Sequence, residues 1–383
     1  MNLHDDPFLK ISNGILNPYV LEWQKKEKKV IGHYCTYIPE ELLYAAGLLP
    51  FRIRATGHEH TDLADIYMVR FTCSFIRATL DMALRGTYDF LDGILICNSC
   101  DHSRRMFELF DLKVFKRKGF IKQVPRFYLS MPHIITEEGF EWYKKEIEQL
   151  KENLEKNISN RPITNINLQT SIEIHNENRS LLRKIHELRI LDAPKLNGTE
   201  ALQISISNAS VPKEMANNEL KRIFNFLKEK EGIKEDSKRI MLIGSEVDDI
   251  TFTKLIENSG AILVSDFLCF GTRNFLDDVK MEVGDTPLES IVKRVYYRMS
   301  CPRMMDDHIR RLKFLKSEIS KAKVDGVILQ RINNCDLAGC ENMMLLHELK
   351  ELDIPILNID REFYQSDTTR LQTRIEAFLE MIS

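Results

Sequence analysis

The sequence lacks the short motifs that mark common nucleotide-binding and hydrolytic sites. It contains no G-x-x-x-x-G-K-[ST], no G-x-G-x-x-G, no H-E-x-x-H and no G-x-S-x-G. We therefore do not expect the chain to bind ATP through a P-loop, and it carries no familiar nucleotide signature of its own.

Long apolar runs and an excess of positive charge are also missing. The longest apolar stretches, such as residues 93–97 and 240–243, are bounded by charge within a few residues, far short of the ~20 needed to span a bilayer. The first ten residues, MNLHDDPFLK, are acidic where a signal peptide has a basic start. The net charge of -3 gives no footprint for nucleic acid. We expect a cytoplasmic protein that binds neither membranes nor nucleic acid.

The eight cysteines carry most of the chemical information in this sequence. A chain of 383 residues predicts two or three domains at roughly 150 residues each, so its core needs no disulfide staple. Because the cytoplasm keeps thiols reduced, the cysteines are expected to pack in the core, bind metal or act in catalysis. Apart from Cys97 and Cys100, they lack the C-x-x-C pairs of a zinc ribbon, so zinc is not favoured.

Short runs rich in Val, Ile and Leu alternate with helix-period segments, which is the pattern of parallel strands joined by crossover helices. In the N-terminal part the predicted strands are residues 29–35, 50–54, 93–97 and 126–130, with helices at 39–47 and 73–84. From about Glu141 to Ser237, charged segments with helical spacing predict a helical connector. The alternation then resumes, with predicted strands at 239–244, 261–265, 326–330 and 355–360 and a last helix at 369–382.

We therefore predict an α/β fold with two Rossmann-like parallel-sheet domains flanking a helical connector. The predicted divisions are an N-terminal α/β domain (1–140), the connector (141–237) and a C-terminal α/β domain (238–383). Open α/β sheets bind ligands at the carboxyl ends of their strands. The site is therefore expected in the cleft between the two domains.

A weak internal repeat links the two α/β parts. The segments FLDGILICNSCDHSRRMFELF and AKVDGVILQRINNCDLAGCENMMLL both read Asp-Gly, an apolar strand, Asn-x-Cys-Asp, and a helix. In each segment a cysteine, Cys100 or Cys335, follows the strand's carboxyl end. If the repeat is real rather than a chance likeness of two βα units, both cysteines face the same cleft.

Three cysteines stand where predicted helices begin. Cys73 precedes a helix, and Cys100 and Cys335 each open one, so their thiolates would lie near helix N-termini that favour negative charge. Three thiolates can hold a [4Fe-4S] cluster and leave one iron open for a substrate oxygen. The alternative is that each is a small buried apolar side chain, the commoner state of a free cysteine.

Several ordered runs make the sequence resemble the 2-hydroxyacyl-CoA dehydratase and benzoyl-CoA reductase family. The runs are YCTYIPEELLYAAGLLPFRI, FTCSFIRATLDMALRG, DFLDGILICNSCDHSRRMFE, SDFLCFGTRNF, SCPRM and VDGVILQRINNCDLAG. They cover most of the chain from about Gly32 onward and leave the connector weakly matched.

The resemblance implies stacked α/β domains and a [4Fe-4S] cluster held by three cysteines. Matched by motif, these are Cys73, Cys100 and Cys335. It also implies a related or identical second subunit and a separate ATP-hydrolysing iron-sulfur activator that delivers a low-potential electron. The implied substrate is an acyl-CoA, whose thioester carbonyl binds at or beside the open iron and accepts one electron to become a ketyl radical anion. In a dehydratase the ketyl then expels the hydroxyl or loses an otherwise unacidic β-proton, whereas in an aryl reductase the electrons enter the ring.

Further residues are candidates for a supporting role. Thr36, Glu40 and Glu41 lie at a predicted strand end and helix start and are candidate catalytic residues, although the two glutamates could instead complement the helix dipole. Arg77, Arg104 and Arg105 lie one turn beyond two of the cysteines and could neutralise the cluster or bind CoA phosphates, or could be surface arginines. Asp101 and Asp336, directly after Cys100 and Cys335, are expected to be helix caps.

Two other functions remain open at this point. A homologous branch builds a double-cubane cluster from six cysteines, and Cys269, Cys301 and Cys340 lie in or near family-like motifs, although SCPRM lacks the paired C-x-C of that branch. A non-catalytic partner subunit is the third alternative, and the retention of all three ligand cysteines argues against it. The sequence leaves the acyl group and the dehydratase or aryl reductase branch undetermined.

Overall fold

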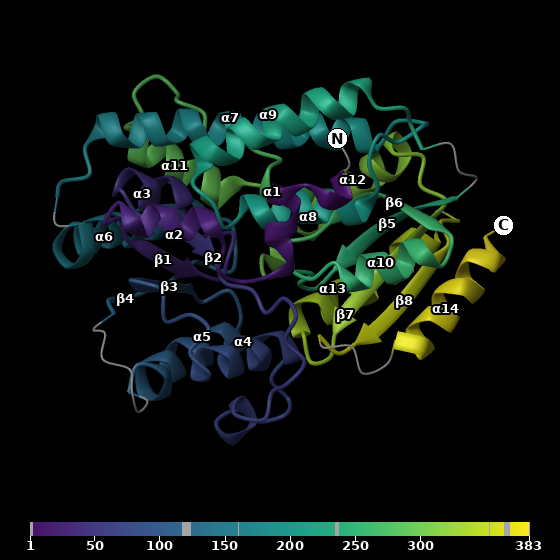
Figure 1. Cartoon of the computed structure of the whole chain (residues 1–383), viewed down its shortest axis with the longest axis horizontal. Helices are drawn as coiled ribbons and strands as arrows, with labels where there is room; N and C mark the ends of the chain where they lie inside the picture. The colour runs from purple at the N-terminus through teal and green to yellow at the C-terminus, as the bar shows by residue number, and fades with distance from the viewer. Residues whose placement is uncertain are drawn as a thin grey trace.

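Two parallel sheets form the framework of the protein (Figure 1). The computed structural model describes residues 3–116, 124–159, 161–233, 237–351, 353–363 and 368–382. Within these residues, each of two four-stranded sheets has only parallel pairings. The strands are β1 (Val30–His33), β2 (Leu49–Arg52), β3 (Gly93–Cys97), β4 (Arg126–Leu129), β5 (Lys238–Gly244), β6 (Ala261–Phe267), β7 (Gly326–Ile332) and β8 (Ile356–Arg361). The predicted α/β fold is confirmed, and each predicted strand is present.

The two sheets have the same topology. Their orders, β2-β1-β3-β4 and β6-β5-β7-β8, are identical when strands are counted along each half. The repeated Asp-Gly pair also has one structural role in both halves. Asp92 Oδ2 accepts from Val30 N at 2.9 Å at the start of β1, and Asp325 Oδ2 accepts from Arg239 N at 2.7 Å at the start of β5. These equivalent contacts support the internal repeat.

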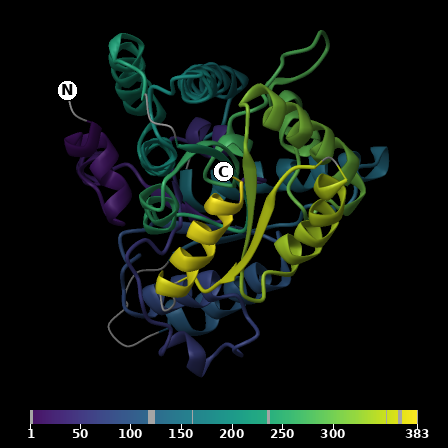
Figure 2. The ribbon, with the colours of Figure 1, turned by 90° about the vertical axis from the view of Figure 1, so that its right-hand side faces the viewer.

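Helices cover both faces of each sheet, as expected for parallel strands that are apolar on both sides. One face of the first sheet packs against α3, α6 and α11, and the other against α2, α4 and α5. The second sheet packs against α8, α10 and α14 on one face and α12 and α13 on the other; Figure 2 shows α14 lying against this sheet. The helix bounds are α1 (Pro7–Lys10), α2 (Pro18–Lys25), α3 (Glu40–Ala45), α4 (Ser74–Leu84), α5 (Asp101–Leu109), α6 (Glu137–Leu154), α7 (Asn165–Arg189), α8 (Gly198–Asn208), α9 (Lys213–Glu229), α10 (Thr251–Asn258), α11 (Pro287–Tyr297), α12 (His308–Lys321), α13 (Asp336–Lys350) and α14 (Thr368–Met381).

The connector consists of the long helices α6 to α9, and α7 and α9 lie along one side of the molecule (Figure 1). Its helices are shared between the two halves, since α6 contributes to the core of the first sheet and α8 to the core of the second. The N-terminal residues Leu3, Phe8 and Leu9 pack on α7, α8 and α9. The division at residues 140 and 237 remains a prediction, and contacts cross both boundaries.

The lengths and apolar content of the helices bear on membrane insertion. No helix in the described part of the chain is both long enough and apolar enough to cross a bilayer.

Candidate active site

A cavity of about 130 Å³ lies between the two sheets. Its walls come from segments that follow the carboxyl ends of strands in both halves, among them Cys35 after β1, Cys100 after β3 and Cys335 after β7. Parallel α/β sheets bind ligands at this end. Six of the eight cysteines line the cavity, namely Cys35, Cys73, Cys100, Cys269, Cys301 and Cys335. The three cysteines predicted as cluster ligands therefore face one space.

The three predicted ligands share one local geometry. Cys73 precedes α4, Cys100 precedes α5 and Cys335 precedes α13, each as the N-cap residue of its helix. Cys100 Sγ accepts a hydrogen bond from Ser103 N at 3.4 Å. Cys73 and Cys335 accept no such cap hydrogen bond, but the backbone N–H three residues on, of Ile76 or Ala338, acts to lower the pKa of each thiol. Helix N–H groups thus stabilise negative charge on all three sulfurs.

Burial nevertheless disfavours free thiolates at this site. It raises the pKa of Cys73 well above the ordinary thiol value, and the neighbouring Cys335 and Cys100 raise it further. Burial also raises the pKa of Cys100 to about 11 and raises that of Cys335. Three thiolates can therefore share this space only with a cationic partner, because like charges repel strongly in a buried site.

The donor set fits an iron-sulfur cluster better than a single metal ion. No group of three or more His, Cys, Asp or Glu side chains within the described ranges is arranged to hold one ion. A cluster of four irons accepts thiolates that stand farther apart, because its own irons and sulfides lie between them. Three cysteine side chains around one cavity, each at the N-cap position of a helix, are suited to a cluster of that size.

A second group of cysteines and arginines adjoins the same cavity. Cys35, Cys269 and Cys301 line it together with Arg52 and Arg273. Cys269 and Cys301 were candidates from the sequence, whereas Cys35 and both arginines were missed. Cys35 lies two residues after β1, Arg52 ends β2, and Arg273 lies six residues beyond β6, so nearness to strand ends was their weak signal in the sequence.

Cys340, the third cysteine considered for a double cubane, lies elsewhere. It is exposed on α13 and does not line the cavity. The double-cubane hypothesis counted Cys340 as the sixth cysteine, but the sixth cysteine that lines this cavity is Cys35. A hydrogen bond from the buried Cys97 thiol lowers the pKa of Cys35 to about 6.

Buried Arg303, from the run SCPRM, ties the loop before Cys100 to the rest of the site. Its guanidinium donates to the carbonyl oxygens of Asn98 and Ser99 after β3 at 3.2 and 3.3 Å. It also donates to Met131 O at 2.7 Å and Pro132 O at 2.5 Å after β4. This arginine therefore fixes the approach to Cys100.

The predicted catalytic residues divide between two cavities. Thr36 lines the cysteine cavity and also a second cavity of about 20 Å³, which Glu40 and Glu41 line. Burial alone would raise the pKa of Glu40, but Lys213, whose Nζ lies 3.3 Å from Glu40 Oε2, and His33 lower it to about 2. Burial would likewise raise the pKa of Glu41, but Arg179 at 2.6 Å holds it far below its usual range. Of these three residues, Thr36 alone reaches the cysteine cavity, and the catalytic roles remain predictions.

The three predicted arginines lie outside the cavity lining. Arg77 is buried and donates to Asp65 Oδ1 at 2.8 Å and Thr72 O at 3.0 Å. Arg104 and Arg105 lie on the exposed face of α5, where Arg104 pairs with Asp101 at 3.4 Å. Their proposed contacts with cluster or CoA remain predictions.

The expectation that aspartates cap the helices after the ligands is wrong. The N-cap residues are the cysteines Cys100 and Cys335 themselves, and Asp101 and Asp336 occupy the first turn. There the carboxylates can still complement the helix dipole.

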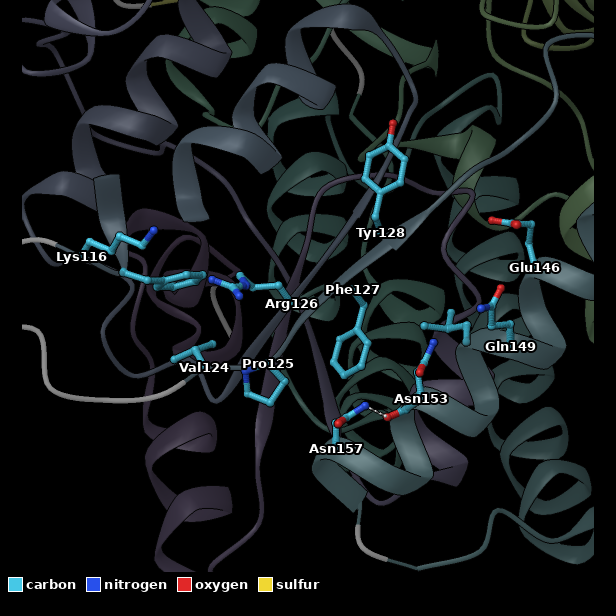
Figure 3. A pocket seen from close by; sticks show the side chains of 12 residues that line it. Lys116, Val124, Pro125, Arg126, Phe127, Tyr128, Glu146, Gln149, Asn153 and Asn157 are labelled. Atoms are coloured by element: carbon cyan, nitrogen blue, oxygen red, sulfur yellow. Dashed lines mark hydrogen bonds between the residues drawn. The ribbon is translucent and has the colours of Figure 1, made fainter. Parts of the chain in front are cut away.

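A larger cavity of about 790 Å³ lies between β4 and α6 (Figure 3). Arg126, Tyr128, Glu146 and Asn153 are among its lining residues, and it contains no cysteine and no predicted site residue. Lys116 and Val124, which border a gap in the described residues, form part of its wall. We therefore take the cysteine cavity as the candidate active site.

The chain is similar to a family model and to several known proteins. Residues 35–382 match a family model described as 2-hydroxyglutaryl-CoA dehydratase, D-component. The chain is 25% identical to the (R)-phenyllactyl-CoA dehydratase beta subunit of Clostridium sporogenes, over 100% of both chains. It is 27% identical to a subunit of the benzoyl-CoA reductase of Thauera aromatica, over 88% of this chain and 87% of the relative. It is 22% identical to the beta subunit of the (R)-2-hydroxyglutaryl-CoA dehydratase of Acidaminococcus fermentans, over 94% of both.

Proposed function

Because the chain belongs to the 2-hydroxyglutaryl-CoA dehydratase D-component family, we propose that it is the cluster-bearing subunit of a 2-hydroxyacyl-CoA dehydratase or a benzoyl-CoA-type reductase. The observation that carries the proposal is the cavity onto which Cys73, Cys100 and Cys335 converge, each as a helix N-cap. These three residues would hold a [4Fe-4S] cluster. When bound, the cluster would supply the low-potential electron that converts an acyl-CoA thioester to a ketyl radical anion.

The residues of this chain would bind and shield the acyl group. Phe75, Ile76, Ile332 and Leu337 give the cavity an apolar lining that excludes water. Thr36, at the same cavity, has a hydroxyl that can donate a hydrogen bond to an acyl oxygen. Arg104 and Arg105 remain candidates for CoA phosphates because they are exposed on the helix that follows Cys100.

The proposal includes two protein partners. One is a related or identical second subunit, in keeping with the relatives, each of which is itself one subunit of a dehydratase or a reductase. The other is an ATP-hydrolysing iron-sulfur activator, since the sequence has no P-loop of its own and the chemistry needs a strongly reducing donor.

A second candidate function is a double-cubane reductase of small molecules. It is favoured by one observation: Cys35, Cys269 and Cys301 line the same cavity as the first three cysteines. Six thiols around one space are enough for two clusters.

Iron and acid-labile sulfide per chain, measured after strictly anaerobic purification, test these two functions. We expect about four irons in the wild type and near none in Cys73→Ala, Cys100→Ala or Cys335→Ala. The matched control is Cys340→Ala, which removes an exposed thiol from the helix that Cys335 caps and should keep its iron.

Other iron contents would change the conclusion. About eight irons, with loss in Cys269→Ala or Cys301→Ala, would favour the double cubane. No iron, even after co-expression with an activator and a partner subunit, would rule out both enzymes and leave a structural subunit.

A further inference from the structure

Arg273 is a buried cation without a carboxylate partner at the wall of the cysteine cavity. It is 3% exposed, and its Nε has no hydrogen-bond partner. One guanidinium nitrogen contacts Cys269 Sγ, and no Asp or Glu in the described ranges forms an ion pair with it. Arg52 also contacts Cys269: it donates to the Cys269 carbonyl oxygen at 2.8 Å and pairs with Glu246 at 3.1 Å. The cavity wall thus carries two guanidinium groups and one carboxylate.

Two other buried arginines nearby are used differently. Arg303 directs its guanidinium to the carbonyl oxygens before Cys100. Arg298 donates to Thr36 O at 2.8 Å and to the carbonyl oxygen of Arg273. Neither lines the cavity, so they act as structural cross-links. Arg273 differs because it lines the cavity and retains an unused donor.

The missing counter-charge of Arg273 calls for an anion. A guanidinium stays protonated in a protein, and a buried unpaired charge is costly. Cys269 Sγ is the one side-chain acceptor of Arg273 in the described part of the chain, and a thiol sulfur is a weak acceptor without a formal charge. A bound ligand that becomes negative in the cavity would supply it.

We propose that Arg273, assisted by Arg52, stabilises the negative charge that forms on the acyl oxygen of a CoA thioester bound in this cavity. The proposal rests on the proposed function. One electron from the low-potential donor enters the neutral C=O group, no bond breaks, and the added charge resides largely on oxygen. Because the thioester is neutral beforehand, the guanidinium interacts more strongly with the reduced state than with the substrate, which lowers the barrier.

The position of Arg273 is fixed before any ligand arrives. Its guanidinium lies over the Phe267 ring, 5.2 Å from the centroid, and Arg298 holds its backbone carbonyl. A low-dielectric wall strengthens the attraction of such a fixed charge for a developing anion. The geometry therefore assigns Arg273 a catalytic role in addition to that of the cysteines.

A 3-oxoacyl thioester tests the proposal without any turnover. Acetoacetyl-CoA loses a proton to solvent to give an enolate, whose negative charge is shared between its oxygens and whose ultraviolet absorbance can be followed. The anaerobically isolated protein, with any subunit that co-purifies, is titrated with acetoacetyl-CoA across a pH series, using difference spectra. A fixed guanidinium beside the thioester oxygen should lower the pKa of the bound ligand by about one to three pH units.

Substitutions identify the responsible group. We expect Arg273→Gln to abolish the lowered ligand pKa while acetoacetyl-CoA still binds by calorimetry, and Arg273→Lys to restore part of it. Arg374→Gln, on α14 and outside the lining of the cysteine cavity, should behave as the wild type. The Lys variant also keeps the test valid if the Gln variant folds poorly.

The possible failures can be told apart. If acetoacetyl-CoA binds without a lowered pKa, or if Arg273→Gln retains the lowered pKa, the role of Arg273 is refuted while the proposed function stands. If the intact protein binds no acyl-CoA ester at all, the proposed function fails as well.

Discussion

At the scale of single residues, cysteine is an unusual choice for a helix N-cap. Ser, Thr, Asp and Asn are preferred there because their oxygens accept strong hydrogen bonds from the first turn. Cys73, Cys100 and Cys335 all occupy that position around one cavity. Sulfur is a weak acceptor, so capping alone does not explain its presence at three converging sites. Metal binding through thiolate would explain it, which supports the proposed cluster.

The buried pair of Glu41 and Arg179 gives a prediction about stability. The two side chains are 1% and 7% exposed and 2.6 Å apart. Glu41→Gln would leave the charge of Arg179 buried with only the more distant Asp278 at 3.4 Å. We expect a loss of about 3 kcal/mol in the free energy of unfolding, measured by urea denaturation at pH 7.

The control for this pair is an exposed one. Lys321 and Glu187 are 2.8 Å apart but about half exposed, so Glu187→Gln should cost less than about 1 kcal/mol. An equal loss in the two variants would mean that Glu41 contributes no more than a surface charge.

Stability should also fall in acid because of Glu40 and Glu41. The pKa of Glu40 in the folded protein is about 2 and that of Glu41 is also depressed, so their contribution is complete above the unfolded value of about 4.3. It is lost as the pH falls through the folded values. The loss of stability between pH 5 and pH 3 should therefore be smaller in Glu41→Gln than in the wild type.

At the scale of elements, the strands and the convergence of three cysteines were predictable, whereas the rest of the cavity lining was not. The apolar runs that became β3 and β5 are short, rich in Ile and Leu, and lie between helical segments, which determines their type and order. The family resemblance, now confirmed, selected Cys73, Cys100 and Cys335.

Other site residues gave no comparable indication. Arg273 lies in a short 3-10 helix, Thr272–Asn274, after β6, and its lack of a carboxylate partner is visible only when the neighbouring chain segments are in place. The helix α11, from the C-terminal half, packs Ile291 and Val295 into the core of the first sheet. Periodicity within α11 identifies its apolar face but not the sheet that this face covers.

The end of β5 gives a prediction at this scale. Gly244 has φ +136°, and a Cβ there would lie 1.8 Å from Gln330 O in the neighbouring strand β7. Gly244→Ala would push apart the two strands that lead to Glu246 and Cys335. We expect the free energy of unfolding to drop by more than about 1 kcal/mol and the iron content to fall, as measured by denaturation and metal analysis.

Gly260 provides the matched comparison. It also has a positive φ, +99°, but nothing lies within 4 Å of a Cβ at that position. Gly260→Ala should therefore show only the backbone strain and keep its iron. If both variants lose the same stability and both keep their iron, contact with Gln330 is not the reason for glycine at position 244.

At the scale of the whole molecule, the cavity depends on how the two halves are held together. Loops at the carboxyl ends of β2 and β5 join directly: Ala55 N donates to Asp248 Oδ2 at 2.6 Å, and Thr56 Oγ1 donates to Asp248 O at 2.6 Å. Arg52 crosses the same boundary to reach Glu246 and Cys269. A substitution at this junction would therefore change the shape of the cavity without replacing a cysteine.

Asp248 makes this junction sensitive to pH, and its neutral variant tests that role. Burial raises its pKa in the folded protein to about 7, from 3.8 when unfolded. Between these values the folded state binds the extra proton, so stability falls as the pH rises through this range.

Asp248→Asn keeps an oxygen to accept from Ala55 and never ionises. It should exceed the wild type at pH 8 by about 2 kcal/mol or more, but not at pH 4. Thr56→Val removes the adjacent bond without a titrating group, so it should lower stability equally at both pH values. If the free energy of unfolding of the wild type falls no more steeply between pH 4 and pH 8 than that of Asp248→Asn, the junction does not depend on a proton at Asp248.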